Sequence, residues 1–272
     1  FREKFPSRFL NTGIAEQNTI GVAAGLAKSG KIVYVYSIIP FVTMRCFEQV
    51  RLDLAYNNTQ VRLVGIGAGM TYGTLGPTHH ATEDVAIMRA IPNMKVICPG
   101  DPIETKELIC QTYDLDGPIY IRLGKNGEPN IHKNPSIIEF GKAAELIKGD
   151  DLILITTSNM LETGNIWVEE WKKEGISVTL VSMHTIKPLD QKFIEKLIDR
   201  KLPIITLEEH NLIGGLGSAV AEIIAESGFT IPFRRIGIND KFSHYVGNHN
   251  FQRKKFNLNE KPNLDTIFKK ST

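Results

Sequence analysis

Short apolar runs alternate with helical patterns along nearly the whole chain, and this alternation limits the fold more than any other feature. The runs at 61–66, 152–156 and 204–207 are apolar at most positions, as is typical of strands covered on both faces. Helical crossovers between such strands imply parallel pairing. We therefore predict an α/β chain with two doubly wound domains in tandem.

The expected elements follow from apolar periodicity and turn residues. In the first half we expect strands at 32–36, 61–66, 95–98 and 119–122 and helices at 43–56, 83–90 and 103–113. In the second half we expect strands at 152–156, 178–181 and 204–207 and helices at 162–173, 191–201 and 216–227. Asp190 is a candidate N-cap for the helix at 191–201.

The character of the sequence changes between Gly124 and Pro135, where turn-forming residues replace the periodic pattern. We place a linker at 127–140, between a first domain at 1–126 and a second at 141–272. A chain of 272 residues suits two domains of about 100–150 residues each.

Charge and composition exclude several classes of protein. The formal net charge is +2, so we expect no strongly basic field of the kind that drives nucleic-acid binding. The short basic run at 253–255, with Lys269 and Lys270, is expected to be a solvated surface. No apolar run approaches the roughly 20 residues that cross a bilayer, so no membrane partner is expected.

Three cysteines, Cys46, Cys98 and Cys110, are too few and too scattered for a disulfide framework. The first residues of the chain also carry no secretory-signal pattern. We expect buried free thiols in a reducing compartment, which places the protein in the cytoplasm.

The first motif that bears chemistry is NTGIAEQN at 11–18, followed by the small residues GVAAGLA at 21–27. Glu16 falls in the first turn of a helix. A carboxylate there can simply bind free backbone N–H groups and complement the helix dipole. The small residues can likewise serve close helix packing, so position alone does not assign a function.

The second motif is GTLGPTHH at 73–80. It lies on a Gly/Pro-rich loop after a strand, where α/β folds place ligands. The adjacent histidines His79 and His80 point in different directions, and no further Cys, His or Asp cluster surrounds them. A zinc site is therefore not expected.

These two motifs, with IPNM at 91–94, resemble the pyrimidine-binding domain of transketolases and deoxyxylulose-phosphate synthases. MHTIKPLD at 183–190 and EEHNLIGGLG at 208–217 are similar to the C-terminal domain of the same enzymes. The resemblance covers nearly the whole chain, and the order of its motifs makes it specific.

The resemblance implies that the cofactor is thiamine diphosphate. Glu16 would then hydrogen-bond to the ring nitrogen N1′ of the aminopyrimidine and so promote removal of a proton from the thiazolium ring. Phe41 is the candidate for stacking on the aminopyrimidine. Arg45 and Phe47 follow it around the turn as further cofactor-binding candidates.

The resemblance also implies a substrate role for His79, which would bind hydroxyl or carbonyl oxygens as the ketose bond breaks. His80 and Lys125 are further substrate-binding candidates, Lys125 near the place of a phosphate-binding arginine. Two departures affect the substrate. Leu75 stands where sugar-phosphate transketolases tend to have an acid, and Gly67 stands where a phosphate-contacting histidine is expected.

The Gly-Asp-Gly motif with its downstream Asn, which holds the metal and the diphosphate in this superfamily, is absent from the sequence. GGLG at 214–217 opens a helix, but the resemblance implies a structural turn there. We therefore expect an N-terminal diphosphate-binding partner subunit that holds Mg²⁺ or Ca²⁺, in an α2β2 assembly, or else a longer chain with residues ahead of Phe1.

Three functions follow from these features. The first is a transketolase-type subunit that transfers a two-carbon ketol unit between sugars or sugar phosphates. The second is the β-subunit of a 2-oxo-acid dehydrogenase E1 component or a deoxyxylulose-phosphate-synthase-like subunit, but the GPTH and IPNM motifs favour the first. The third is a non-catalytic regulatory or assembly subunit, and the presence of Glu16 and His79 counts against it.

Overall fold

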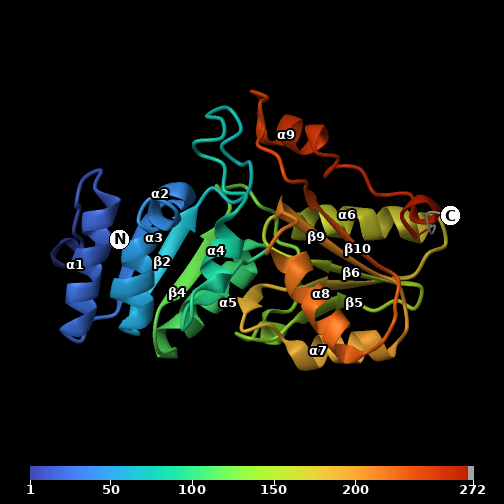
Figure 1. Ribbon diagram of the computed structural model, residues 1–272, viewed down its shortest axis with the longest axis horizontal. Coiled ribbons are helices and arrows are strands. Elements are labelled where there is room, and N and C mark those ends of the chain that lie inside the picture. Colours follow the sequence, from blue (N-terminus) through green and yellow to red (C-terminus); the bar gives the residue numbers. More distant parts are fainter. Residues whose placement is uncertain (269–272) are drawn as a thin grey trace.

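The computed structural model describes residues 1–268 and consists of two sheets flanked by helices (Figure 1). The first sheet has the strand order β1-β2-β4-β3-β8 and the second β10-β9-β6-β7-β5. The strands of the first sheet are β1 (Val33–Ile38), β2 (Val61–Ile66), β3 (Lys95–Ile97), β4 (Ile119–Leu123) and β8 (Thr185–Lys187). Those of the second are β5 (Ala144–Ile147), β6 (Leu152–Thr156), β7 (Val178–Ser182), β9 (Ile204–Asn211) and β10 (Phe233–Ile238).

The helices alternate with these strands, so the predicted α/β class is confirmed. Those of the first half are α1 (Glu16–Lys28), α2 (Ile39–Thr43), α3 (Phe47–Gln49), α4 (Asp84–Ala90) and α5 (Pro102–Gln111). Those of the second half are α6 (Met160–Lys173), α7 (Gln191–Asp199), α8 (Leu216–Ser227), α9 (His249–Lys255) and α10 (Leu264–Phe268). Short 3-10 or π turns lie at Pro6–Arg8, Val50–Tyr56, Thr112–Asp114 and Pro135–Ile137. None of the helices described in residues 1–268 is long and apolar enough to span a membrane.

Purely parallel pairing is wrong for both sheets. β8 runs antiparallel to β3, and β5 runs antiparallel to β7. β8 belongs by sequence to the second half of the chain but completes the first sheet. An added antiparallel strand pairs the otherwise open edge of a parallel sheet. Both strands are short, which explains why they were not predicted from periodicity.

The predicted helix at 43–56 is replaced by three shorter segments. Pro40 lies in the first turn of α2, where its fixed φ suits a helix start, so the helix begins earlier than predicted. α2 ends at Thr43, and α3 and a π-helical segment at Val50–Tyr56 follow. The predicted N-cap of α7 is confirmed, since the Asp190 carboxylate accepts the Phe193 N–H at 3.1 Å.

Each sheet packs into a hydrophobic core. The core of the first sheet contains Ile20 from α1 and Val61 and Leu63 from β2, and it continues between the sheets to Ile153 of β6. Trp167 and Trp171 of α6 are buried against the other face of the second sheet, with ring centroids 6.0 Å apart.

The prediction that all cysteines are buried is only partly right. All three thiols are free, and Cys46 and Cys98 are buried, but Cys110 is exposed. Cys110 lies near the end of α5, on its solvent side. Burial raises the pKa of the Cys46 thiol to about 12, with a further contribution from Glu16.

The basic run at 253–255 is not uniformly solvated, which corrects the prediction for Arg253. Its residue exposure is only 6%, and its guanidinium pairs with the buried Glu209. The carboxylate comes from a distant strand, β9, so the local sequence could not show it. Lys269 and Lys270 lie outside the described residues.

The segment after β4 is fixed to the first half by Asp101, the N-cap of α5. Its carboxylate accepts the Glu104 N–H at 2.7 Å, and the Ile131 and His132 N–H groups at 2.8 and 2.9 Å. The His132 ring nitrogen Nδ1 lies 3.2 Å from the same carboxylate. Burial opposes ionisation of Asp101, but these hydrogen bonds outweigh it and lower its pKa from 3.8 to about 2.

We expect Asp101→Asn to reduce the free energy of unfolding at pH 7 by about 2 kcal/mol, because the amide cannot replace the ionised acceptor. A lowered pKa stabilises the fold above the unfolded value of 3.8, and this stability is lost as the pH falls towards about 2. Urea unfolding at pH 7 and at about pH 3.5 would therefore show a smaller difference at the lower pH. Asp114→Asn, at an exposed position, is the matched control, and an equal loss in that variant would contradict the role.

Candidate active site

The candidate residues gather beyond the carboxyl ends of adjacent strands in the first sheet. Phe41 in α2 follows β1, Gly67 follows β2 and Lys125 follows β4. Because these three strands are parallel neighbours, their ends meet at one edge of the sheet. This edge is where open α/β sheets bind ligands.

Glu16 is placed by the start of α1. Gly13 has φ +75°, a conformation that favours glycine, and its N–H bonds to the Asn11 side chain at 2.9 Å. This turn leads directly into the helix, of which Glu16 is the first residue. The Glu16 side chain is only 12% exposed, and its carboxylate oxygen Oε2 lies 3.1 Å from Arg45 Nη1.

Arg45 and Phe41 connect Glu16 to the histidine loop. The Arg45 guanidinium lies over the Phe41 ring, 4.2 Å from its centroid. The Phe41 and His79 rings meet edge to face, with centroids 5.1 Å apart. Cation–π and edge-to-face contacts of this kind favour one relative orientation of the side chains.

His79 is presented by a loop that closes on itself. Gly69 and Ala81 form an antiparallel bridge at the base of the loop. Within the loop, the His79 N–H donates to the Gly76 carbonyl at 3.0 Å. The Thr78 hydroxyl lies 2.9 Å from His79 Nδ1, so Nε2 is the ring nitrogen left to face a ligand.

Tyr72 is a residue of the candidate site that was not predicted from the sequence. Its ring centroid lies 6.2 Å from that of His79, and Lys125 Nζ lies 5.4 Å above it. The ring also fills the space beside Gly67, where a Cβ atom would approach it to 2.2 Å. Burial, with a contribution from Tyr36, raises the pKa of the Tyr72 phenol. An aromatic residue on the loop between Gly67 and His79 was the only signal in the sequence.

The structure thus joins six side chains into a continuous row, which we call the site row, formed by Glu16, Arg45, Phe41, His79, Tyr72 and Lys125. Two other predicted site residues lie outside it. Phe47 packs, partly buried, against the hydrophobic core. His80, at the end of the loop, is buried, and burial lowers its pKa; its electrostatic neighbours are Glu209, His79 and His249. None of the ring, cation–π or ion-pair contacts that form the row involves it.

The glycine-rich start of α8 is already occupied by a carboxylate. Glu208 accepts the Leu216 and Gly217 N–H groups, each at 2.8 Å. An anion bound there would have to displace this buried side chain. The finding agrees with a structural turn and leaves no free phosphate loop at 214–217.

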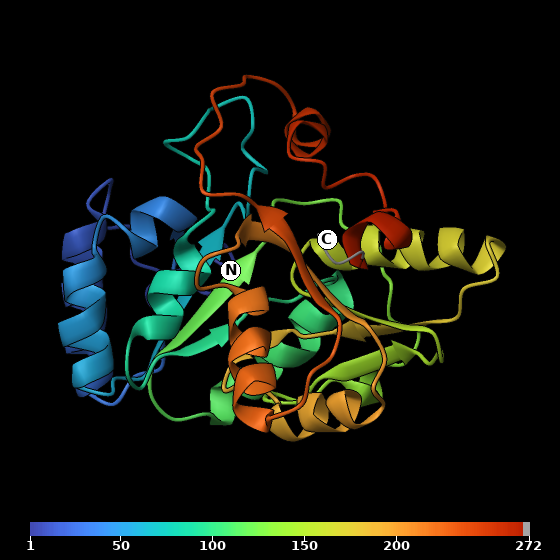
Figure 2. The same cartoon turned by 45° about the vertical axis from the view of Figure 1, so that its right-hand side comes forward.

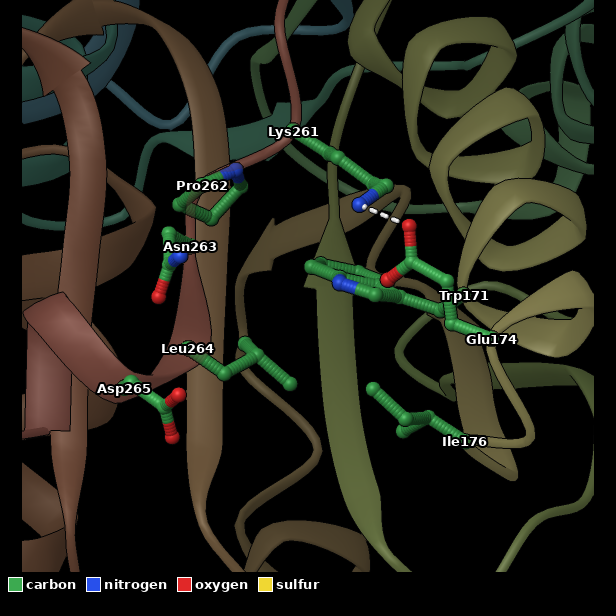
Figure 3. A pocket seen from close by; sticks show the side chains of 8 residues that line it. All are labelled: Trp171, Glu174, Ile176, Lys261, Pro262, Asn263, Leu264 and Asp265. Atoms are coloured by element: carbon green, nitrogen blue, oxygen red, sulfur yellow. Dashed lines mark ion pairs between the residues drawn. The ribbon is translucent and has the colours of Figure 1, made fainter.

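Within residues 1–268 no group of three His, Cys, Asp or Glu side chains is placed to hold a metal ion. A pocket in the second half, between α6 and the segment before α10, is lined by Trp171 and Leu264 and crossed by a 2.7 Å ion pair between Lys261 and Glu174 (Figure 3). It contains none of the residues of the site row.

The residues of the site row suit the aminopyrimidine ring of thiamine diphosphate but not its diphosphate. A largely buried carboxylate beside an aromatic side chain can bind a ring nitrogen and pack against an aminopyrimidine. A diphosphate with its metal needs oxygen ligands and free backbone N–H groups. The described residues offer no such ligand cluster, and Glu208 fills the start of α8.

Comparison with known proteins assigns both halves of the chain. Residues 1–128 match the family model "Transketolase, pyrimidine binding domain", and residues 141–256 match "Transketolase, C-terminal domain". A putative transketolase C-terminal section from Methanocaldococcus jannaschii is 44% identical over 244 residues, which cover 89% of this chain and 76% of that protein. An apulose-4-phosphate transketolase subunit from Actinobacillus succinogenes is 38% identical, covering 93% of this chain and 82% of that protein. The chain therefore belongs to the transketolase family.

Solved structures give the same assignment. A split-gene transketolase described as an inactive β4 tetramer superposes with a TM-score of 0.87 at 36% identity, covering 95% of this chain and 82% of that one. The transketolase of Pichia stipitis, at 21% identity and a TM-score of 0.75, shares the fold, and this chain covers 35% of it.

Among relatives by sequence, a deoxyxylulose-phosphate synthase from Shouchella clausii is 34% identical, and the chain covers 39% of its length. These relatives favour a transketolase subunit, a transferase, over a synthase-like or regulatory protein.

Proposed function

We propose that this chain is the aminopyrimidine-activating subunit of a split, thiamine-diphosphate-dependent transketolase in the cytoplasm. The observation that carries the proposal is the site row, in which contacts run from Glu16 through Arg45 and Phe41 to His79. This order would place the proton-handling carboxylate on the cofactor side and the histidine on the substrate side.

When bound, thiamine diphosphate supplies the nucleophilic carbon and the electron sink for the reaction. Glu16 would hold a proton at ring nitrogen N1′, and its helix start fixes the direction of the carboxylate. Phe41 would pack against the aminopyrimidine. His79 Nε2 would donate to the reacting oxygen of the sugar, while Thr78 engages Nδ1 on the opposite side of the ring.

A partner chain would supply the diphosphate and metal site, with Mg²⁺ or Ca²⁺ as the ion. Two observations support this. The Gly-Asp-Gly motif is absent from the sequence, and several relatives, of which this chain covers about four fifths, are themselves named as transketolase subunits. We propose an N-terminal diphosphate-binding subunit and an α2β2 assembly.

The substrate side of the site row favours a sugar unlike the common pentose phosphates. Gly67 has φ +96°, and the Tyr72 ring occupies the space beside it, so no phosphate-binding side chain can extend from position 67. Leu75 is 52% exposed on the loop, and its apolar side chain cannot accept a hydrogen bond from a sugar hydroxyl. One relative is named as a 6-deoxy-6-sulfo-D-fructose transketolase subunit. We propose an acceptor that is less phosphorylated, or that carries its charge elsewhere, such as a modified or nucleotide-linked sugar.

The proposed reaction is tested by steady-state kinetics of the chain reconstituted with its partner, thiamine diphosphate and Mg²⁺. With xylulose 5-phosphate as donor, we expect ribose 5-phosphate to be a poor acceptor. Losing two charge-assisted contacts, each worth about 1.5–3 kcal/mol, lowers affinity at least about 100-fold. A kcat/KM for ribose 5-phosphate of about 10⁴ M⁻¹s⁻¹ or more would contradict the acceptor proposal. Absence of ketol transfer with every ketose and aldose tried would contradict the function itself.

His79→Ala is expected to lower turnover by about 10²-fold or more, while cofactor affinity stays within a few-fold, because His79 faces the substrate. The measurements are the thermal midpoint, the cofactor Kd and kcat/KM on one preparation. Thr74→Ala, on an exposed position of the same loop, is the control and should retain turnover. A lowered melting midpoint with unchanged activity of the folded fraction would show that His79 only shapes the loop.

A further inference from the structure

We propose that the second half of the chain positions the loop that carries His79, and that the buried carboxylate of Glu209 is the principal positioning group. The functional part of this proposal rests on the proposed role of His79. The loop spans residues 70–80 between Gly69 and Ala81, and we call it the His79 loop. Figures 1 and 2 show it rising from the first sheet next to the segment that leads to α9.

The base of the His79 loop is bonded to Glu209. The Glu209 carboxylate, from β9 of the second sheet, accepts the Met70 N–H at 2.7 Å. It lies so close to Gly69 that a Cβ atom there would meet it at 2.6 Å. Gly69 and Ala81 exchange two backbone hydrogen bonds, of 3.1 and 2.8 Å, so fixing one strand of the base also fixes the other.

Glu209 is itself immobilised by two basic side chains of α9. His249 Nε2 lies 2.7 Å from Oε1, and Arg253 Nη2 lies 2.6 Å from Oε2. Burial disfavours the charged carboxylate, but Arg253 and His249 outweigh it and lower the pKa of Glu209 well below its usual range. The side chain is therefore an ionised, fully buried acceptor with one fixed direction.

A second connection reaches further along the His79 loop. The Gln252 amide of α9 donates to the Gly73 carbonyl at 3.3 Å. Gly73 also packs against backbone, since a Cβ atom there would meet the Gly247 carbonyl at 2.6 Å. The Gln252 amide oxygen accepts the Ser243 hydroxyl at 2.6 Å, so the connecting side chain is held at both ends.

These contacts have a consequence for the site row. Tyr72 and His79 lie within the His79 loop, but Phe41 and Glu16 lie on elements of the first half. The distance between the two groups, such as the 5.1 Å between Phe41 and His79, therefore depends on where the loop is held. Misplacement of a positioned catalytic side chain by about 1 Å can cost about 10²-fold in rate.

Glu208 provides a matched control one residue away. It is equally buried, but its carboxylate accepts N–H groups of Leu216 and Gly217 at the start of α8 and makes none of the loop contacts. Glu208→Gln and Glu209→Gln each replace one buried carboxyl group of the same strand by an amide. Burial raises the pKa of Glu208 to about 7, so the control matches Glu209 in position, burial and shape, and both variants are compared above pH 7, where Glu208 is also mainly ionised. A purely structural role predicts similar consequences for both.

The first measurement is hydrogen exchange of the full chain, followed by mass spectrometry. In Glu209→Gln we expect peptides covering 70–80 to exchange about tenfold faster or more than in wild type, since a charge-assisted bond is weakened. In Glu208→Gln the faster exchange should be confined to the start of α8. Gln252→Leu leaves Glu209 in place and removes the Gly73 contact together with the bonds of Gln252 to Ser243 and Tyr245. It should give a smaller increase in exchange of the His79 loop, and it is the test variant if Glu209→Gln does not fold.

The second measurement is kinetic, on the reconstituted enzyme and normalised to the folded fraction. Glu209→Gln should lower kcat/KM by about tenfold or more with cofactor Kd nearly unchanged, and Glu208→Gln should not. Wild-type exchange at 70–80 in both Glu209→Gln and Gln252→Leu would overturn the proposal, as would equal kinetic loss in Glu208→Gln. If wild type shows no ketol transfer, the proposed function fails, and the exchange experiment alone decides whether the second half holds the loop.

Discussion

Replacing Glu16 by glutamine is expected to slow proton exchange at the thiazolium C2 of bound thiamine diphosphate by about 10²–10⁴-fold. Glutamine keeps the shape of the side chain, and α1 supplies the same direction, but an amide cannot form the charge-assisted bond to ring nitrogen N1′. The exchange can be followed by NMR in the assembled enzyme, before any substrate is added. Ketol transfer should fall in parallel.

Glu48→Gln is the matched control for this experiment. Glu48 lies in the first turn of α3 and is exposed, and its carboxylate accepts a hydrogen bond from the neighbouring Gln49 amide. Its replacement should leave both exchange and melting midpoint near wild type. Exchange in Glu16→Gln within a few-fold of wild type would leave Glu16 as a helix-start carboxylate paired with Arg45 and nothing more.

The second large effect concerns the chain without its partner. We expect no measurable ketol transfer from this chain alone with thiamine diphosphate and Mg²⁺, and full activity once an N-terminal transketolase subunit is added. The roles that we propose for the site row involve only the aminopyrimidine and the substrate, and within residues 1–268 no group of three His, Cys, Asp or Glu side chains is placed to hold a metal ion. Steady-state turnover across a titration of the partner should saturate at one partner per chain. Turnover that does not change with added partner would contradict the split-enzyme proposal.

Much of the fold could be predicted because its determinants are local. Continuous apolar runs identified strands such as β2 and β6, and Asp190 identified the start of α7. The antiparallel edge strands β5 and β8 were not predicted, because each is short and is defined by its neighbour. The early start of the helix expected at 43–56 depends on Pro40, whose effect on where a helix starts is visible only once the end of β1 is known.

The candidate site was predictable only where its residues belong to motifs that stand in the same order as in the transketolase family. The structure brings Glu16, Phe41, Arg45, His79 and Lys125 into one row, but this adjacency depends on three strand ends meeting. Tyr72 was missed because its contact with Gly67 is made through the turn of the His79 loop. The burial of His80 near Glu209 and His249, and the burial of Arg253 against Glu209, likewise depend on contacts between distant segments.

Calorimetric titration of thiamine diphosphate with Mg²⁺ tests the central claim most directly, because it asks whether this chain holds half of the cofactor site. We predict weak binding by the chain alone and binding at least about 10²-fold tighter by the reconstituted complex, since the diphosphate and metal contribute several charge-assisted contacts. In the complex, Glu16→Gln should weaken cofactor binding relative to the wild-type complex while leaving assembly intact. Tight binding by this chain alone, unchanged when the partner is added, would contradict the account.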